Sequence, residues 1–365
     1  MMTKKLKMNI KKIKFLPFII FLMIFIFNGC ATIVYKTIPL RNIAKAKGPY
    51  FVGTQNFQIV DASRKMWFSG DIKGSRKLSV KMWYPADNIA SLKKAPYLNK
   101  HKLIGSAISK LFGVPEALMD RAGGVKCNSW LNAVPANGKF PIIIYSHGHQ
   151  SIKIANTSQA EEMASNGYIV VAMDHSYDAA LTILDEDKII YSRSKLPAND
   201  EEALQDSMIL RVKNQLKIRT EDVSFVIDEL KIMFEKDKRF SQVADFDNIG
   251  IFGHSFGGCT SIMSAYNDTR IDAVIGLDAY FLPLPKEIIK KDLNTPFVHL
   301  GQVSWGDSDN YEVMSELGKS SNREFYHFAI EGSKHNDYTD FSQFTKLTRK
   351  FGSGKISPKN IRYIM

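Results

Sequence analysis

Cysteine is scarce in this sequence, with three residues among 365, and one of them, Cys30, lies in the N-terminal segment. Only Cys127 and Cys259 remain in the rest of the chain. Two cysteines cannot form the disulfide framework on which small secreted domains depend. Internal repeats and low-complexity tracts are missing as well. With 45% hydrophobic and 24% charged residues, the composition is that of an ordinary globular protein.

The sequence also lacks a dense block of lysine and arginine interleaved with aromatic residues, so a nucleic-acid partner is not expected. The net charge of +12 is uneven, because six lysines in the N-terminal segment carry half of it. The remaining charge is typical of a solvated basic face and also suits an anionic lipid surface. The apolar run at residues 15–27 is shorter than the ~20 residues that a transmembrane helix needs.

The N-terminal segment has the order of a secretory signal, which is lysines, then the apolar run, then a small residue before Cys30. Gly29-Cys30 is similar to the lipobox of bacterial lipoproteins, whose cysteine is lipidated and becomes the mature N-terminus. Ala31 after the cysteine resembles the signal for outer-membrane sorting in Gram-negative bacteria. We therefore expect a signal peptide at residues 1–29, lipidation of Cys30, and a lipid-anchored protein of the bacterial cell envelope. An uncleaved anchor is the alternative.

Apolar runs and helical patterns alternate along the rest of the chain. The predicted strands are residues 78–84, 141–145, 168–173, 249–252, 273–277, 297–300 and 325–330. Helical patterns occur at residues 155–165, 200–234, 259–266 and 286–293, and a polar ribbon is predicted at residues 181–191. Strands that alternate with helices predict an α/β fold, with a doubly wound, mainly parallel sheet and helices on both faces.

The segment Ile249-Gly-Ile-Phe-Gly-His-Ser-Phe-Gly-Gly258 contains the pattern Gly-x-Ser-x-Gly between a predicted strand and a predicted helix. This context is typical of a nucleophile elbow, in which the serine stands at the tip of a strained turn. A Cβ at position 253 or 257 would clash, because strand and helix pass close on either side. We therefore predict that Ser255 is a nucleophile. The alternative is an ordinary glycine-rich turn with a solvated serine.

A serine nucleophile needs a general base and an acid that orients the base, and in such a sheet both come from the carboxyl ends of strands. His335 follows the last predicted strand and is the expected base. Two places compete for the acid. Asp278 ends the strand after the elbow, whereas Asp307 and Asp309 follow the next strand. Topology alone favours Asp307, and either choice preserves the order Ser, Asp, His.

The oxyanion formed during acyl transfer needs two hydrogen-bond donors. The expected donors are the N–H groups of Phe256 and of His149, which lies in the turn after residues 141–145 where Gly148 permits a close approach. The same turn contains His147-x-His149, a pattern that also occurs in metal sites, with Asp174 or His175 as a further ligand. Because no carboxylate cluster completes such a site, we expect neither a metal nor another cofactor.

Several blocks of this sequence resemble, in the same order, those of the secreted-type platelet-activating factor acetylhydrolases, which are serine-dependent phospholipases of the α/β-hydrolase fold. These blocks are Tyr145-Ser-His-Gly148, Gly253-His-Ser-Phe-Gly-Gly258, Leu277-Asp-Ala279, and Gly332-Ser-x-His335 with Asp340-Phe341. The resemblance runs from about residue 77 to residue 341. It implies that Ser255 is the nucleophile, Asp278 the acid and His335 the base. It also implies an oxyanion hole made by the amides of His149 and Phe256.

The resemblance implies a serine carboxylester hydrolase that acts on lipid esters and removes short sn-2 acyl groups. The membrane surface, reached through the lipid anchor, is the expected partner besides the substrate. Residues 30–50 are then a tether, and residues 51–365 are an α/β-hydrolase catalytic domain. The alternatives are a general small-ester or polyester esterase of the dienelactone hydrolase or cutinase type, a metal-dependent hydrolase, and a surface lipoprotein without enzymatic activity.

One further pattern has two interpretations. Apolar residues recur at helical spacing between positions 103 and 112 and predict an amphipathic helix. They are Leu103, Ile104, Ala107, Ile108, Leu111 and Phe112. The apolar stripe either packs against the domain or contacts a membrane, as the resemblance implies for a helix at this place.

Overall fold

A computed structural model describes residues 40–365 except 113–115, 117–120, 199, 292 and 306–307. Its main feature is a ten-stranded sheet with the order β12-β11-β10-β9-β5-β6-β2-β1-β4-β3. The strands are β1 (Phe51–Lys65), β2 (Ser75–Ala86), β3 (Lys94–Pro96), β4 (Lys126–Leu131), β5 (Phe140–Ser146), β6 (Ile169–Asp174), β9 (Ala244–His254), β10 (Ile271–Leu277), β11 (Phe297–Gln302) and β12 (Phe325–Ile330). A separate ribbon pairs β7 (Leu181–Ile183) with β8 (Ile189–Tyr191).

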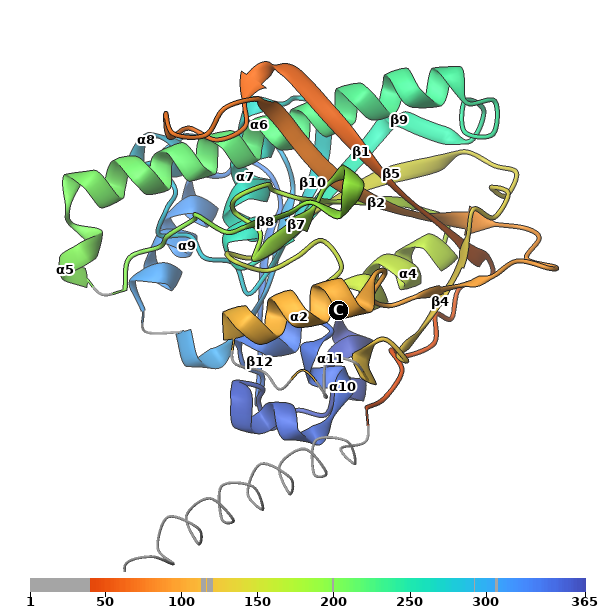
Figure 1. Ribbon diagram of the computed structural model, residues 1–365. Helices are drawn as coiled ribbons and strands as arrows, with labels where there is room; N and C mark the ends of the chain where they lie inside the picture. The colour runs from red at the N-terminus through yellow and green to blue at the C-terminus, as the bar shows by residue number, and fades with distance from the viewer. Residues whose placement is uncertain (1–39, 113–115, 117–120, 199, 292, 306–307) are drawn as a thin grey trace, which may run out of the picture.

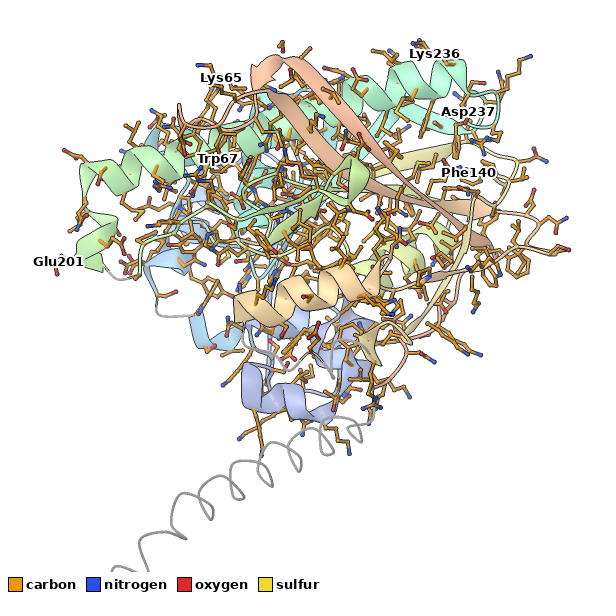
Figure 2. The ribbon with its side chains drawn as sticks, in the orientation of Figure 1. Lys65, Trp67, Phe140, Glu201, Lys236 and Asp237 are labelled. Carbon is orange, nitrogen blue, oxygen red and sulfur yellow. The ribbon has the colours of Figure 1, made fainter. Side chains whose placement is uncertain are left out.

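Helices connect the strands of the sheet. They are α2 (His101–Phe112), α4 (Thr157–Ser165), α5 (Asp200–Ala203), α6 (Asp206–Lys236), α7 (Phe256–Asn267), α8 (Lys286–Ile289), α9 (Asp309–Ser320), α10 (Phe341–Phe344) and α11 (Pro358–Ile364). The long helix α6 runs across the top of the view in Figure 1. Figure 2 labels Lys236 and Asp237 at one end of it and Glu201, in α5, beyond the other. Among the described residues, no helix has both the length and the apolar character that crossing a membrane requires.

The predicted architecture is confirmed, because β5, β6 and β9 to β12 are parallel and helices cover both faces of the sheet. Alternate residues of each strand enter separate cores, as the two-residue repeat of a strand requires. In β5, Ile142 and Ile144 join the core that contains α6 and α7, whereas Tyr145 joins the core that contains α4. The carboxyl ends of the parallel strands therefore meet at one edge, where a site can be assembled.

The antiparallel end of the sheet was predicted only in part. β2 contains the strand predicted at residues 78–84 and pairs antiparallel with β6, but β1, β3 and β4 were not predicted. β1 lacks a regular alternation of buried and exposed residues, so its periodicity carried little signal. The predicted helix at residues 286–293 is also shorter, because α8 ends at Ile289.

Two predicted segments, the tether and the amphipathic helix, pack against the domain with those of their residues that the structure describes. Within residues 40–50, the side chain of Ile43 is buried, and the Gly48 amide donates a hydrogen bond to the Ser165 hydroxyl. Residues 30–39 of the predicted tether, with the signal peptide and Cys30, lie outside the described residues. In α2, Ile104 and Ala107 are buried in a small core beside the sheet. The inner part of the apolar stripe therefore contacts protein.

Candidate active site

The turn from β9 into α7 has the geometry of a nucleophile elbow. Ser255 lies at the tip of this turn with φ 56° and ψ −122°, a strained combination for a residue with a side chain. A Cβ on Gly253 would lie 2.1 Å from the Gly257 carbonyl oxygen, and one on Gly257 would lie 2.0 Å from that of Ser146. The predicted reason for these two glycines is therefore confirmed, since strand, turn and helix leave no space for a side chain.

The structure brings His335 and Asp278 together from separate elements. Asp278 follows the last residue of β10, has φ 44° and is fully buried. The Nδ1 of His335, the first residue of a 3₁₀ turn after β12, donates a hydrogen bond of 2.6 Å to Asp278 Oδ2. This bond fixes the neutral tautomer in which Nε2 is free to accept a proton. The His335 side chain is 34% exposed, so substrate can reach the ring.

Asp309, one of the two other predicted acids, does not share this position. Asp309 is exposed as the first residue of α9. Asp307, which topology favoured, lies outside the described residues.

Gln302 supports the Asp278 carboxylate and was missed in the sequence. The Gln302 backbone amide donates to Asp278 Oδ1 at 2.9 Å, and its side-chain amide donates to Oδ2 at 2.7 Å. Both donors come from the end of β11, which pairs with β10. These two donors hold the Asp278 carboxylate in the position from which it accepts the hydrogen bond of His335. The position of Gln302 in the sequence could have indicated this role, because a polar residue at the carboxyl end of a predicted strand lies at the same edge of the sheet as the site.

His254, the residue before the nucleophile, lies beside the proposed base. Its ring lies 4.5 Å from the His335 ring, centroid to centroid. His254 Nε2 contacts the His335 carbonyl oxygen at 3.0 Å. Burial holds the pKa of His254 well below its ordinary value, and the nearby His335 acts in the same direction. A neutral His254 therefore packs against the turn that carries His335.

The two predicted oxyanion donors belong to segments that meet at Ser255. Phe256 is the first residue of α7, where N–H groups have no acceptor within the helix. On the other side, a Cβ built on Gly148 would lie 3.3 Å from Ser255 Cβ, so the turn that contains His149 passes directly beside the serine. This approach places both backbone segments next to the atom that would attack an ester.

Arg219 in α6 ties these two segments together and was also missed. Its guanidinium donates to the backbone oxygen of His147 and, at 3.0 Å, to the Ser146 hydroxyl. It also lies 4.9 Å from the centroid of the Phe256 ring and pairs with Asp178 at 2.5 Å. Arg219 is fully buried. Its planar fork of donors is suited to holding several acceptors in fixed positions, which a lysine cannot do.

We expect Arg219→Lys to lower kcat about 10²-fold, the order seen when one oxyanion donor is lost, because the turn before His149 would shift. Stability should also fall, by about 1.5–3 kcal/mol for each lost hydrogen bond to the charged group. Arg76→Lys is the matched control, because Arg76 is equally buried but binds Asp222 and the Met66 carbonyl. Turnover and thermal unfolding measured on both variants separate positioning from stability. Equal losses of kcat in the two variants would contradict the positioning role.

The alternative of a metal site at His147-x-His149 does not fit the contacts. His147 uses one ring nitrogen on the Gly148 carbonyl and accepts the His175 amide with the other. His175 contacts Ser146 with one ring nitrogen and Asp222 with the other. Asp174 pairs with Lys153. The ring nitrogens of His147 and His175 are therefore occupied by the protein itself.

Comparisons with known proteins identify relatives of this chain. The model of the family "Platelet-activating factor acetylhydrolase, isoform II" matches residues 36–360. A platelet-activating factor acetylhydrolase of Gallus gallus is 24% identical over 346 residues, which cover 87% of this chain and 76% of the relative. The Canis lupus familiaris protein of the same name is 24% identical over 356 residues, or 89% and 72% of the two chains.

A ferulic acid esterase from Streptomyces cinnamoneus has a similar structure. The superposition has a TM-score of 0.71 and 24% sequence identity, and it covers 89% of each chain. This likeness shows the α/β-hydrolase fold. Because the family model matches almost the entire chain, the protein belongs to the platelet-activating factor acetylhydrolase, isoform II, family of ester hydrolases.

Proposed function

We propose that this protein is a serine carboxylester hydrolase of lipid esters, in which Ser255 is the nucleophile, His335 the general base and Asp278 the acid. The observation that supports this proposal most directly is the hydrogen bond between His335 and Asp278. The position of Ser255 at the tip of a strained elbow adds to it. Nucleophile, base and orienting acid in this chain order are typical of α/β-hydrolases.

In the proposed reaction, His335 Nε2 takes the proton of the Ser255 hydroxyl, and the serine oxygen attacks the ester carbonyl carbon. The amides of His149 and Phe256 donate to the oxyanion that forms. As the intermediate collapses, the bond to the alcohol breaks and His335 returns the proton to the leaving oxygen. Water then hydrolyses the acyl-enzyme with the same base. Asp278 keeps the imidazole in its tautomer and stabilises the imidazolium.

We propose further that the substrates are phospholipids with a short acyl group at sn-2. The support is membership of a family that is described by the acetylhydrolase activity, together with vertebrate relatives of the same name. The test is hydrolysis of 2-acetyl, 2-hexanoyl and 2-palmitoyl phosphatidylcholine and of ethyl ferulate. We expect kcat/KM to be at least tenfold higher for the 2-acetyl lipid than for the 2-palmitoyl lipid. A preference for ethyl ferulate would favour the small-ester alternative instead.

We also propose that the protein is lipid-anchored at Cys30 in a bacterial cell envelope. The support is the lysine-rich start, the short apolar run and Gly29-Cys30. We expect Cys30→Ser to move the protein from the membrane fraction to the soluble fraction, because stable anchoring needs acyl chains and a serine at position 30 carries none. Carbonate extraction followed by immunoblotting measures the distribution, with Cys127→Ser as the control. A Cys30→Ser protein that resists carbonate extraction would favour an uncleaved anchor.

A further inference from the structure

A cavity of about 320 Å³ lies between β1, β2 and the elements that cover them. Its walls come from β1 and β2, from α2, from residues 152–154 and from the start of the β7–β8 ribbon. In Figure 1 these elements, α2 and β7 among them, lie in the middle of the view. None of the residues proposed for catalysis lines this cavity. It is therefore separate from the site around Ser255.

A buried lysine faces this cavity. Lys81, in β2, lines the cavity and is 2% exposed. Within the described part of the chain, its ammonium has no hydrogen bond or ion pair, and it lies 4.9 Å from the centroid of the Trp83 ring. Burial lowers the pKa of Lys81, because an ionised ammonium that is removed from water without a counter-ion is costly. The cavity is the place from which a counter-ion can reach it.

The other charges near the cavity are already paired. Lys153 contacts Asp174, and Lys100, at the exposed end, contacts Asp187. Asp185 accepts a hydrogen bond from the side chain of Gln58. Lys81 is thus the lysine of this wall that lacks an acidic partner among the described residues.

The two buried carboxylates that interact electrostatically with Lys81, Glu161 and Asp340, have partners of their own. Glu161 accepts from the amide and hydroxyl groups of Ser129 and from Asn128. Asp340 accepts from the Ser158 amide and the Tyr97 hydroxyl. These donors hold both carboxylates in place. Neither carboxylate therefore serves as the contact ion of Lys81.

The rest of the wall is apolar in part, beside polar side chains such as Asn56, Ser79 and Asn99. Ile104 from α2, Ile154, and Leu181 and Ile183 from β7 line it, and all are buried or half-buried. A ligand that complements this cavity has one anionic group for Lys81 and a short apolar portion for these side chains. We propose that this cavity is a binding site for a small organic monocarboxylate, whose carboxylate pairs with Lys81.

The charges favour a monoanion over a dianion such as a phosphate ester. Among the described residues, three lysines (Lys81, Lys100 and Lys153) and two aspartates (Asp174 and Asp185) line the cavity, so one negative charge on a ligand balances the charge of the wall. The volume is at the small end for ligand pockets, which limits the apolar portion to a short chain. The proposal does not depend on the esterase activity, because the cavity shares no residue with the proposed catalytic centre.

Isothermal titration calorimetry with hexanoate tests the proposal on the full-length protein and on Lys81→Met, which keeps the length of the side chain without its charge. We expect one hexanoate site in the unaltered protein and at least tenfold weaker binding in Lys81→Met. Lys139→Met is the matched control, because Lys139 is exposed and does not line the cavity, and it should bind hexanoate within about twofold of the unaltered protein. Hexanol and hexyl phosphate should each bind at least tenfold more weakly than hexanoate. Equal hexanoate affinity in Lys81→Met, or tighter binding of hexyl phosphate, would overturn the proposal.

A second measurement uses the unaltered protein and so does not depend on the folding of a variant. Crystals grown with 6-bromohexanoate locate the ligand by the anomalous signal of bromine. We expect the bromine beside Ile104 and Leu181, with the carboxylate within hydrogen-bond distance of the Lys81 ammonium. A bromine signal only at Ser255, or none at a saturating concentration, would show that the cavity does not bind carboxylates.

Discussion

Replacing Ser255 by alanine is expected to remove ester hydrolysis and labelling by a fluorophosphonate together. The loss of a catalytic serine that acts with a histidine base lowers kcat by about 10⁶-fold in a well-studied hydrolase, and a similar loss is expected here. Stability should change by less than about 0.5 kcal/mol, because alanine keeps the Cβ and the same strained backbone. Hydrolysis of 2-acetyl phosphatidylcholine, mass spectrometry of the labelled protein and thermal unfolding measure the three effects.

A serine within α7, the helix that follows the elbow, provides the matched control. Ser261 is buried in α7, and its hydroxyl donates to the Gly257 carbonyl at 2.9 Å. Ser261→Ala should therefore keep both turnover and labelling. If the purified, folded Ser255→Ala protein still reacts with the fluorophosphonate at the rate of the unaltered protein, Ser255 is not the nucleophile.

The second large effect is expected for Asp278→Asn, which should lower kcat by about 10⁴-fold. An asparagine amide that turns its NH₂ group toward His335 Nδ1 favours the opposite tautomer, so Nε2 would carry the proton and no longer act as a base. The Gln302 backbone amide still donates to the remaining carbonyl oxygen and holds the side chain in place, whereas the Gln302 side-chain amide loses its acceptor. Pre-steady-state kinetics of acylation with p-nitrophenyl acetate measures the effect directly.

The controls are the two aspartates that follow β11. Asp309→Asn changes an exposed residue of α9, and Asp307→Asn changes the residue that topology alone favoured. Both variants should keep kcat within about threefold of the unaltered protein. A loss of several orders of magnitude in Asp307→Asn, with an active Asp278→Asn, would assign the acid to the end of β11.

The elements closest to the site could be predicted because their causes are local. The apolar runs that became β5, β6, β9, β10, β11 and β12 are continuous, as buried parallel strands require. The elbow is specified within a few residues, because Gly253 and Gly257 lack the Cβ atoms that would clash where strand, turn and helix lie against each other. The amphipathic helix at residues 103–112 was likewise visible from its spacing.

By itself, therefore, the sequence determined the class of fold, the position of Ser255 and the edge at which its partners gather. The tertiary structure decided which carboxylate lies beside His335, because β10 and β11 end next to each other and Gln302 binds Asp278. It also placed Arg219 under the oxyanion turn and left Lys81 facing a cavity. These features depend on burial and on contacts between residues far apart in the chain. A local pattern of apolar and polar residues does not contain that information.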